Sequence, residues 1–208
     1  MKPEIDYTLY LVTDKDMLLG VSLEDAVESA ARGGCSLVQL REKKASSREF
    51  LDCAAAVKRV TDRYGVPLII NDRVDIALAV DAAGVHVGQS DLPVALVRKI
   101  VGSDRIIGAS ASTFIQAEEA VRAGADYLGV GAMFATGTKT EAEITPLEEL
   151  RRIRAAFTTP IVVIGGVNLD TIPLFRPIGI DGIAVVSAIL AQPDIELATK
   201  RLRKAFCG

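Results

Sequence analysis

The sequence has few cysteines, a single histidine and no long apolar runs, and each shortage excludes a class of structure or function. Among 208 residues there are three cysteines and one histidine. The cysteines (Cys35, Cys53 and Cys207) show no C-x-x-C spacing, which argues against a disulfide framework or a thiolate metal site. No segment approaches the roughly 20 apolar residues of a membrane span, and the start of the chain, MKPEIDYTLYLVTDKD, does not resemble a signal peptide. We therefore expect a cytoplasmic protein without a membrane partner.

An excess of positive charge is also missing. The net charge is −3, so the chain as a whole is not a polyanion binder, and we expect no nucleic-acid partner. Half of the residues are hydrophobic and a quarter are charged, a balance typical of a soluble globular enzyme. Any affinity for phosphate must come from a local cluster.

Eight short aliphatic runs recur along the chain, and an amphipathic or polar segment follows each. Most runs are nearly continuous in apolar character, which is typical of strands covered on both faces in a parallel sheet. Eight cycles without a G-x-G-x-x-G motif after the first run favour a single (β/α)8 TIM barrel over a doubly wound open sheet, with residues 1–208 as one catalytic domain. The expected strands are 8–13, 36–40, 67–71, 84–88, 105–110, 127–131, 161–166 and 182–187.

Three helices are clear in the sequence, over residues 22–32, 46–64 and 145–157. Ser22 is the expected N-cap of the first. Several helices are expected to close on a glycine before the next strand, because glycine takes the left-handed conformation that ends a helix. These glycines are Gly33, Gly34, Gly84, Gly124 and Gly179.

Polar and charged residues that could take part in binding or catalysis lie just after the expected strands. In a barrel these loops converge on the face that carries active sites. The run REKK (41–44), directly after the second strand, would be a solvated loop if judged alone. The polar segments that follow the other strands favour a grip on an anion.

Two glycine or serine turns, IGGVN (164–168) and VVSAI (185–189), follow the last two strands. Phosphate binding there recurs in this fold, because glycines let backbone N–H groups approach an anion. The bland alternative is a tight turn plus an N-cap serine. FATGTK (134–139) suits a loop that closes over phosphate, although such loops are often mere surface.

Asp72 and Asp91 lie on neighbouring loops, in NDR and GQSDLP. Singly, each is more often a helix N-cap. Together, opposite a basic cluster, they favour a Mg²⁺ site that keeps waters and bridges to substrate phosphates.

His86 lies mid-strand and is expected to be a packed or hydrogen-bonded barrel residue rather than a general base, and no Ser-His-Asp triad can be built around it. The expected site thus has many groups that can bind phosphate and magnesium and few that can act as general acids or bases. It suits a reaction in which a diphosphate leaves once its charge is neutralised.

The segments YLVTD, VQLREK, NDR, GVHVGQSDLP, GASAST, TGTK, IGGV and AVVSAI resemble, in order and spacing, the thiamine phosphate synthase family over essentially the whole chain. The resemblance implies that a hydroxymethylpyrimidine diphosphate ionises with Mg²⁺ to a pyrimidinylmethyl cation. The nitrogen of a thiazole phosphate then captures this cation. Ser112 and Ala135 depart from the family pattern, which often has histidine and proline there.

The resemblance also implies a role for individual residues. Arg41, Lys43, Ser110 and Lys139 would be catalytic, and Asp72 and Asp91 would ligate Mg²⁺. Gln39, Arg41, Lys43, Asn71, Ser110 and Lys139 would hold the pyrimidine diphosphate, while Thr136, Thr138, Gly166, Val186 and Ser187 would hold the thiazole phosphate. Leu40, Glu42 and Gly137 complete the expected substrate-binding set.

Three alternatives stay open at this stage. The first is a related thiazole tautomerase, which looks as if it lacks the Asn-Asp-Arg, Gln-Ser-Asp and Thr-Lys segments present here. The others are a non-catalytic barrel that binds thiazole phosphate and a phosphate-sugar isomerase, the latter disfavoured by the absence of an evident base. A homo-oligomer is left open.

Overall fold

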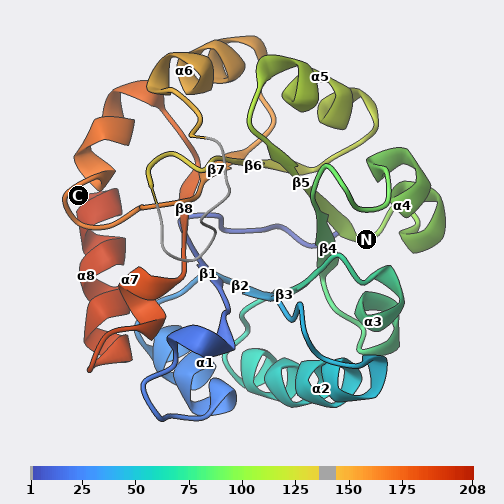
Figure 1. Ribbon diagram of the computed structural model, residues 1–208, viewed down its shortest axis with the longest axis vertical. Coiled ribbons are helices and arrows are strands. Elements are labelled where there is room, and N and C mark those ends of the chain that lie inside the picture. The colour runs from blue at the N-terminus through green and yellow to red at the C-terminus, as the bar shows by residue number, and fades with distance from the viewer. Residues whose placement is uncertain (1, 136–143) are drawn as a thin grey trace.

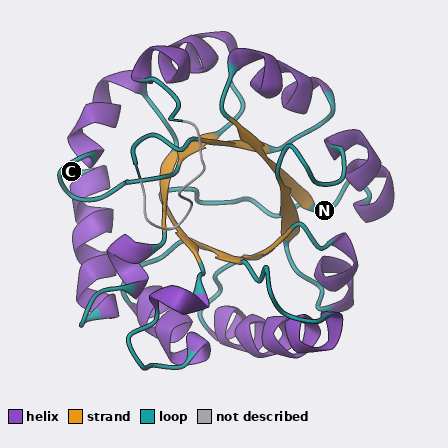
Figure 2. Cartoon of the chain, in the orientation of Figure 1, coloured by secondary structure: helices purple, strands orange, loops and turns teal. Residues whose placement is uncertain are grey.

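The computed structural model describes residues 2–135 and 144–208, and they form a closed (β/α)8 barrel (Figures 1 and 2). All neighbouring strands pair in parallel, and β1 pairs with both β2 and β8 to close the ring. This confirms the expected fold. The strands are β1 Leu9–Val12, β2 Leu37–Leu40, β3 Leu68–Asn71, β4 Gly84–Val87, β5 Ile106–Ala111, β6 Tyr127–Val130, β7 Ile161–Val163 and β8 Gly182–Val185.

Helices form the outer ring (Figure 2). Ser22 caps α1 by accepting a hydrogen bond from the backbone N–H of Asp25, as expected, and Ser46 and Glu49 form a capping box at the start of α2. The α-helices are α1 Leu23–Arg32, α2 Ser47–Arg63, α3 Val74–Ala79, α4 Val94–Val101, α5 Phe114–Arg122, α6 Leu147–Ala156, α7 Ser187–Leu190 and α8 Ile195–Cys207. Two 3₁₀ helices, η1 Lys15–Met17 and η2 Ile172–Ile178, follow β1 and β7.

The apolar residues divide into two cores. The larger lies between the strands and the helices and includes Leu11, Val38 and Ile70. The smaller fills the barrel interior and includes Tyr10, Leu37, Ile69 and Tyr127. Because successive strand residues face opposite sides, nearly continuous apolar runs follow from burial on both faces.

Two expectations about local structure are wrong. Gly84 does not end a helix. Helix α3 stops at Ala79, and Asp81 takes the left-handed backbone with φ 53°. Gly84 instead opens β4, where a Cβ would lie 2.1 Å from the carbonyl oxygen of Ile106, so close strand contact is what requires glycine there. The run 161–166 is a strand only to Val163, because the glycines that follow turn the chain.

The segment before β1 crosses the end of the barrel where the strands begin (Figure 1). The Tyr7 ring packs against Tyr127 in a tilted arrangement with ring centroids 5.0 Å apart, and Ile5 packs against the interior core. Lys2 pairs with Asp126, just before β6. The floor of the barrel is therefore built from the N-terminal residues, and the mouth lies at the other end.

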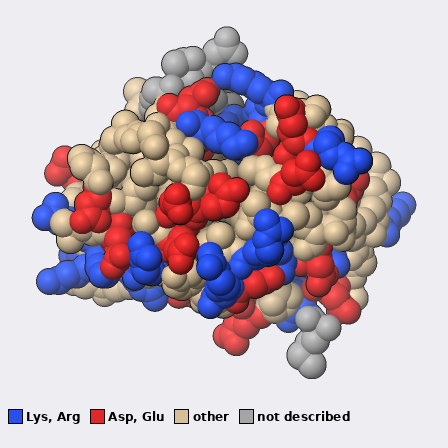
Figure 3. Space-filling view, turned by 90° about the horizontal axis from the view of Figure 1, so that it is seen from below, with Lys and Arg blue, Asp and Glu red and all other residues tan. Residues whose placement is uncertain are grey.

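Charged side chains of both signs are interspersed on the face shown in Figure 3. Within the described ranges, no helix combines the length and the apolar character that a bilayer crossing requires.

Candidate active site

Polar side chains occupy the inward positions at the carboxyl ends of the strands. Leu37 and Ile69 belong to the interior core, and the next inward residues on their strands are Gln39 and Asn71, both buried. Ser110 holds the corresponding place on β5, four residues after Ile106. The mouth of the barrel is thus lined by amide and hydroxyl groups directly above an apolar interior.

A chain of hydrogen bonds crosses the barrel beneath this polar layer. Gln39 Nε2 donates to the Tyr10 hydroxyl at 2.8 Å, which contacts the Tyr127 hydroxyl at 2.8 Å. His86 Nδ1 lies 2.9 Å from the Tyr127 hydroxyl, and His86 Nε2 lies 2.9 Å from Ser110 Oγ. The expectation that His86 is a hydrogen-bonded barrel residue is confirmed. These hydrogen bonds connect Gln39 and Ser110 through three buried side chains, a connection that the sequence pattern did not predict.

Burial lowers the pKa of His86 to about 4, so the ring is neutral near pH 7. Since both ring nitrogens already have hydroxyl partners, the histidine is poorly placed to serve as a general base toward a molecule in the mouth.

A second cluster joins a cation to two acids. Lys43 Nζ donates to the Asp72 carboxylate, and the carboxyl groups of Asp72 and Asp91 are within hydrogen-bonding reach of each other. Burial and the neighbouring Asp91 raise the pKa of Asp72. Burial also acts to raise the pKa of Asp91, but hydrogen bonds from Asp72 and from the Gly88 N–H outweigh it and lower that pKa. The two pKa values thus move in opposite directions, as expected for two carboxyl groups in contact.

Neither aspartate caps a helix. The N-cap of α3 is Arg73 and that of α4 is Pro93, and neither helix has a side-chain cap hydrogen bond. Asp72 also has a left-handed backbone with φ 60°, which costs a non-glycine residue about 1–3 kcal/mol. The helix-cap alternative therefore fails for both residues, and the strained backbone aims the Asp72 carboxylate at Lys43 and Asp91.

The REKK run is held by the loop after β1. Lys15 contacts Glu42 at 3.0 Å, Lys44 contacts Asp16 at 2.9 Å, and Arg41 Nη1 lies 3.7 Å from Asp14 Oδ2. Each charge in Asp14-Lys15-Asp16 thus lies beside a charge of opposite sign, on Arg41, Glu42 and Lys44 respectively.

Sequence reasoning missed this partner segment. The alternating signs of DKD, opposite those of REKK, were the available signal. Asp14 is the functional candidate that follows, because it orients Arg41, and Thr13 adds a hydrogen bond from the Arg41 N–H to its hydroxyl at 3.0 Å.

Two residues of the expected substrate set are already engaged elsewhere. The Leu40 side chain is fully buried in the outer core, so only its backbone faces the mouth. Glu42 is paired with Lys15. Four others, Thr136, Gly137, Thr138 and Lys139, lie outside the described residues.

The expected phosphate residues lie at the ends of two adjacent strands. Gly166 follows β7 and Val186 and Ser187 follow β8, and these strands pair with each other. Gly166 has φ 67°, and a Cβ there would lie 2.6 Å from that of Phe134, so glycine is required for close packing. The local structure differs from expectation in two respects. Val186, not Ser187, is the N-cap of the short α7, and η2 begins six residues beyond Gly166.

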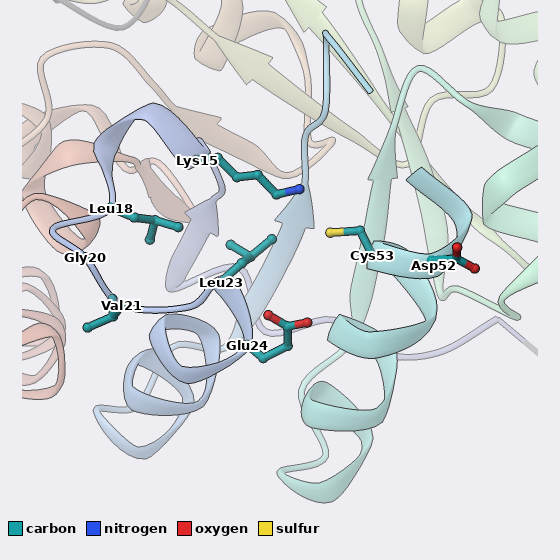
Figure 4. Close-up of a pocket in the computed structure, with 8 residues that line it drawn as sticks. All are labelled: Lys15, Leu18, Gly20, Val21, Leu23, Glu24, Asp52 and Cys53. Carbon is teal, nitrogen blue, oxygen red and sulfur yellow. The ribbon is translucent and has the colours of Figure 1, made fainter. Parts of the chain in front are cut away.

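A hollow of about 500 Å³ lies outside the barrel, between α1 and α2 (Figure 4). Lys15, Leu23 and Cys53 line it, and Figure 4 shows the Lys15 nitrogen pointing toward Cys53. None of the expected site residues that the structure describes lines this hollow. The mouth of the barrel, at the ends of the strands that carry those described residues, remains the candidate site.

The acids suit a hard cation. In the described part of the chain no three His, Cys, Asp or Glu side chains gather as a metal cage. Asp72 and Asp91 supply carboxylate oxygens from two adjacent loops, next to a lysine. Mg²⁺ is commonly held by one or two carboxylates together with waters and substrate phosphates, so this donor set fits it.

A family model, curated relatives named as thiamine-phosphate synthases and a solved structure match this chain. A family described as thiamine monophosphate synthase matches residues 9–189. The thiamine-phosphate synthase of Clostridium beijerinckii is 59% identical over 99% of both chains, and that of Ruminiclostridium cellulolyticum is 56% identical over 99% of this chain and 98% of its own. Among solved structures, thiamine phosphate pyrophosphorylase from Pyrococcus furiosus superposes with a TM-score of 0.89 at 37% identity, covering 97% of this chain and 96% of that one.

Proposed function

The chain belongs to the thiamine monophosphate synthase family, and from that premise we propose how its residues carry out the activity of a thiamine-phosphate synthase. The substrates would be 4-amino-2-methyl-5-hydroxymethylpyrimidine diphosphate and 4-methyl-5-(2-phosphoethyl)thiazole. The products would be thiamine phosphate and diphosphate. This is a transferase reaction on small molecules at the mouth of the barrel.

One observation carries the proposal: Lys43, on the loop after β2, contacts the Asp72 carboxylate after β3, which in turn neighbours Asp91 after β4, and neither acid caps a helix. A cation beside a pair of metal-binding carboxylates is suited to a diphosphate group. Arg41, oriented by Asp14, adds a second cation on the same loop as Lys43. Gln39, Asn71 and Ser110 would contact the same substrate from the ends of β2, β3 and β5, with Lys139 and the backbones of Leu40 and Glu42 completing its site.

The thiazole phosphate would bind on the opposite side of the mouth. Gly166, Val186 and Ser187 lie at the ends of β7 and β8, where backbone N–H groups can approach an anion. Thr136, Gly137 and Thr138 belong to the same proposed subsite. Two anionic substrates held side by side would place the thiazole nitrogen near the pyrimidinylmethyl carbon.

The bond changes are those of a dissociative substitution. The bond between the methylene carbon and the diphosphate oxygen breaks, and its electron pair leaves with diphosphate. The thiazole nitrogen then donates its lone pair to the resulting cation and forms the new carbon–nitrogen bond. Lys43 and Arg41 stabilise the negative charge that develops on the leaving group, with Ser110 as a hydrogen-bond donor and Lys139 as a further cation. No general base is required, in accord with the engaged nitrogens of His86.

Mg²⁺ is the proposed cofactor, and Asp72 and Asp91 are its proposed ligands. When bound, it would neutralise diphosphate charge. The protein's own contribution is to hold the two carboxyls in contact on adjacent loops, one of them with a strained backbone.

We propose a cytoplasmic location, which the free state of Cys35, Cys53 and Cys207 supports. We also propose that residues 1–208 act as one catalytic domain, with a homo-oligomer left open.

The decisive assay mixes the two substrates with the protein and Mg²⁺ and measures thiamine phosphate and diphosphate. We expect the two products in equal amounts. Thiazole isomerisation without diphosphate release would instead favour the tautomerase. For the dissociative step, an isotope label at the bridging oxygen of the pyrimidine diphosphate should scramble within that phosphate when the thiazole is omitted. Retention of the label would contradict a cationic intermediate.

A further inference from the structure

Five side chains from five strands form one continuous path of hydrogen bonds across the barrel: Gln39, Tyr10, Tyr127, His86 and Ser110. Both ends of this path are proposed substrate contacts. Its three middle members, Tyr10, Tyr127 and His86, are buried. The path therefore offers a physical link between two groups on opposite sides of the site.

The interior is shaped to hold this path. A Cβ at Gly108 would lie 2.1 Å from Tyr127 Cζ, and a Cβ at Gly129 would lie 3.0 Å from His86 Cε1. Neither glycine has a positive φ, so the space for the two rings is what requires glycine at these positions. The rings of His86 and Tyr127 also pack against each other, with centroids 5.5 Å apart.

The donors and acceptors fix a direction along the path. An amide nitrogen cannot accept a hydrogen bond, so the Tyr10 oxygen accepts from Gln39 and its own hydrogen goes to Tyr127. The Tyr127 hydrogen then goes to His86 Nδ1, which must be unprotonated. A neutral imidazole consequently carries its hydrogen on Nε2 and donates it to Ser110 Oγ. The Ser110 hydrogen is left free to point into the mouth.

The opposite direction would require the Gln39 amide to be turned over. Every bond would then reverse, His86 would carry its hydrogen on Nδ1, and Ser110 would donate into the barrel instead of toward the mouth. A mixed arrangement would leave a buried tyrosine hydrogen without an acceptor, which is costly. The tautomer of His86 therefore reports the direction of the whole path.

We propose that Tyr10, Tyr127 and His86 are positioning residues that hold Ser110 as a hydrogen-bond donor toward the substrate and orient the Gln39 amide at the same time. This rests on the proposed function, in which Gln39 and Ser110 contact the pyrimidine diphosphate. It assigns a role to a histidine and two tyrosines that do not touch the reacting atoms.

The test uses the fact that His86 is the only histidine in the chain. Correlation of ring nitrogens with ring protons in ¹⁵N-labelled full-length protein near neutral pH gives one set of signals. We expect the pattern of an imidazole protonated on Nε2. The pattern of the Nδ1–H form would overturn the proposal whether or not the protein has synthase activity, so this readout is independent of the proposed function.

Tyr127→Phe removes the hydroxyl that sets the tautomer. In this variant we expect a mixture of the two tautomers and a loss of turnover of about tenfold or more, with thiazole phosphate affinity unchanged. Tyr7→Phe is the matched control, because the Tyr7 ring packs against Tyr127 with centroids 5.0 Å apart while its hydroxyl is not part of the path. It should keep the Nε2–H pattern and the wild-type turnover.

If Tyr127→Phe retains both the wild-type pattern and the wild-type turnover, the proposal is wrong. Should that variant fail to fold, Tyr10→Phe serves in its place. It leaves Tyr127 free to donate to His86, so we expect the Nε2–H pattern to persist while turnover falls through release of Gln39. Wild-type turnover in Tyr10→Phe would contradict the positioning of Gln39. If the wild type released no diphosphate, the proposed synthase activity would be wrong. The tautomer of His86 would still test the direction of the hydrogen-bond path.

Discussion

Lys43 donates a hydrogen bond from its ammonium group to the Asp72 carboxylate, although the residues are 29 positions apart and follow different strands. The proposed diphosphate contact and a proposed Mg²⁺ ligand are thus in direct contact. On the proposed function, each would have to rearrange in part if a diphosphate and a cation shared the site.

Lys43→Ala should weaken the binding of the pyrimidine diphosphate by about 1.5–3 kcal/mol, the contribution of a charge-assisted hydrogen bond. Isothermal titration would measure the dissociation constant, with thiazole phosphate affinity expected to stay the same. Lys44→Ala is the matched control, since that side chain is 85% exposed and pairs with Asp16 away from Asp72. Equal losses in both variants would remove the specific role of Lys43.

Asp91→Asn should raise the Mg²⁺ concentration required for half-maximal turnover about tenfold or more and lower the turnover itself. It removes one of two carboxylates while leaving an oxygen that can still accept from the Gly88 N–H. Thiazole phosphate affinity should change little. Asp75→Asn, at an exposed acid that pairs with Arg73, provides the comparison and should leave the magnesium dependence unaltered. If Asp91→Asn weakened thiazole phosphate binding as much as it weakened the response to Mg²⁺, Asp91 would have a structural role instead.

His86 should make the protein less stable in acid. Its native pKa of about 4 lies below the ordinary 6.5, so the unfolded chain takes up the proton first as the pH falls. The free energy of unfolding should therefore decrease between about pH 6.5 and 4 by about 3 kcal/mol from this residue. Urea unfolding at several pH values would measure it. In His86→Gln the slope over this window should be shallower, and an unchanged slope would show that carboxyl groups account for the effect.

Gly108→Ala should destabilise the fold by about 1–3 kcal/mol, because the added methyl would overlap the Tyr127 phenol. Gly65→Ala is a useful comparison. Nothing lies within 4 Å of a Cβ there, so only its left-handed backbone is strained, at about 1 kcal/mol. Denaturation midpoints of the two variants would separate crowding from backbone strain. A smaller loss at Gly108 than at Gly65 would mean that Tyr127 shifts freely.

The barrel could be predicted from the sequence because the signals for its strands and helices lie within short stretches of the chain. Continuous apolar runs such as PLIIN and IVVIGG, and caps such as Ser22, act within a few residues. The pairing of Asp14 with Arg41 and the path from Gln39 to Ser110 join distant positions whose meeting depends on strand register. Periodicity alone does not provide that register. The cap alternative for Asp72 likewise failed on a backbone angle that no local pattern indicated.

The pairing of β1 with β8 has a consequence for how the chain is made. Leu9–Val12 emerges from the ribosome before its second neighbour, Gly182–Val185, which is synthesised after all the other strands of the barrel. During translation one edge of β1 lacks its final partner, and unpaired strand edges promote aggregation. A nascent chain that stalls before β8 would therefore be a target for chaperones, and ring closure would be a late event in folding.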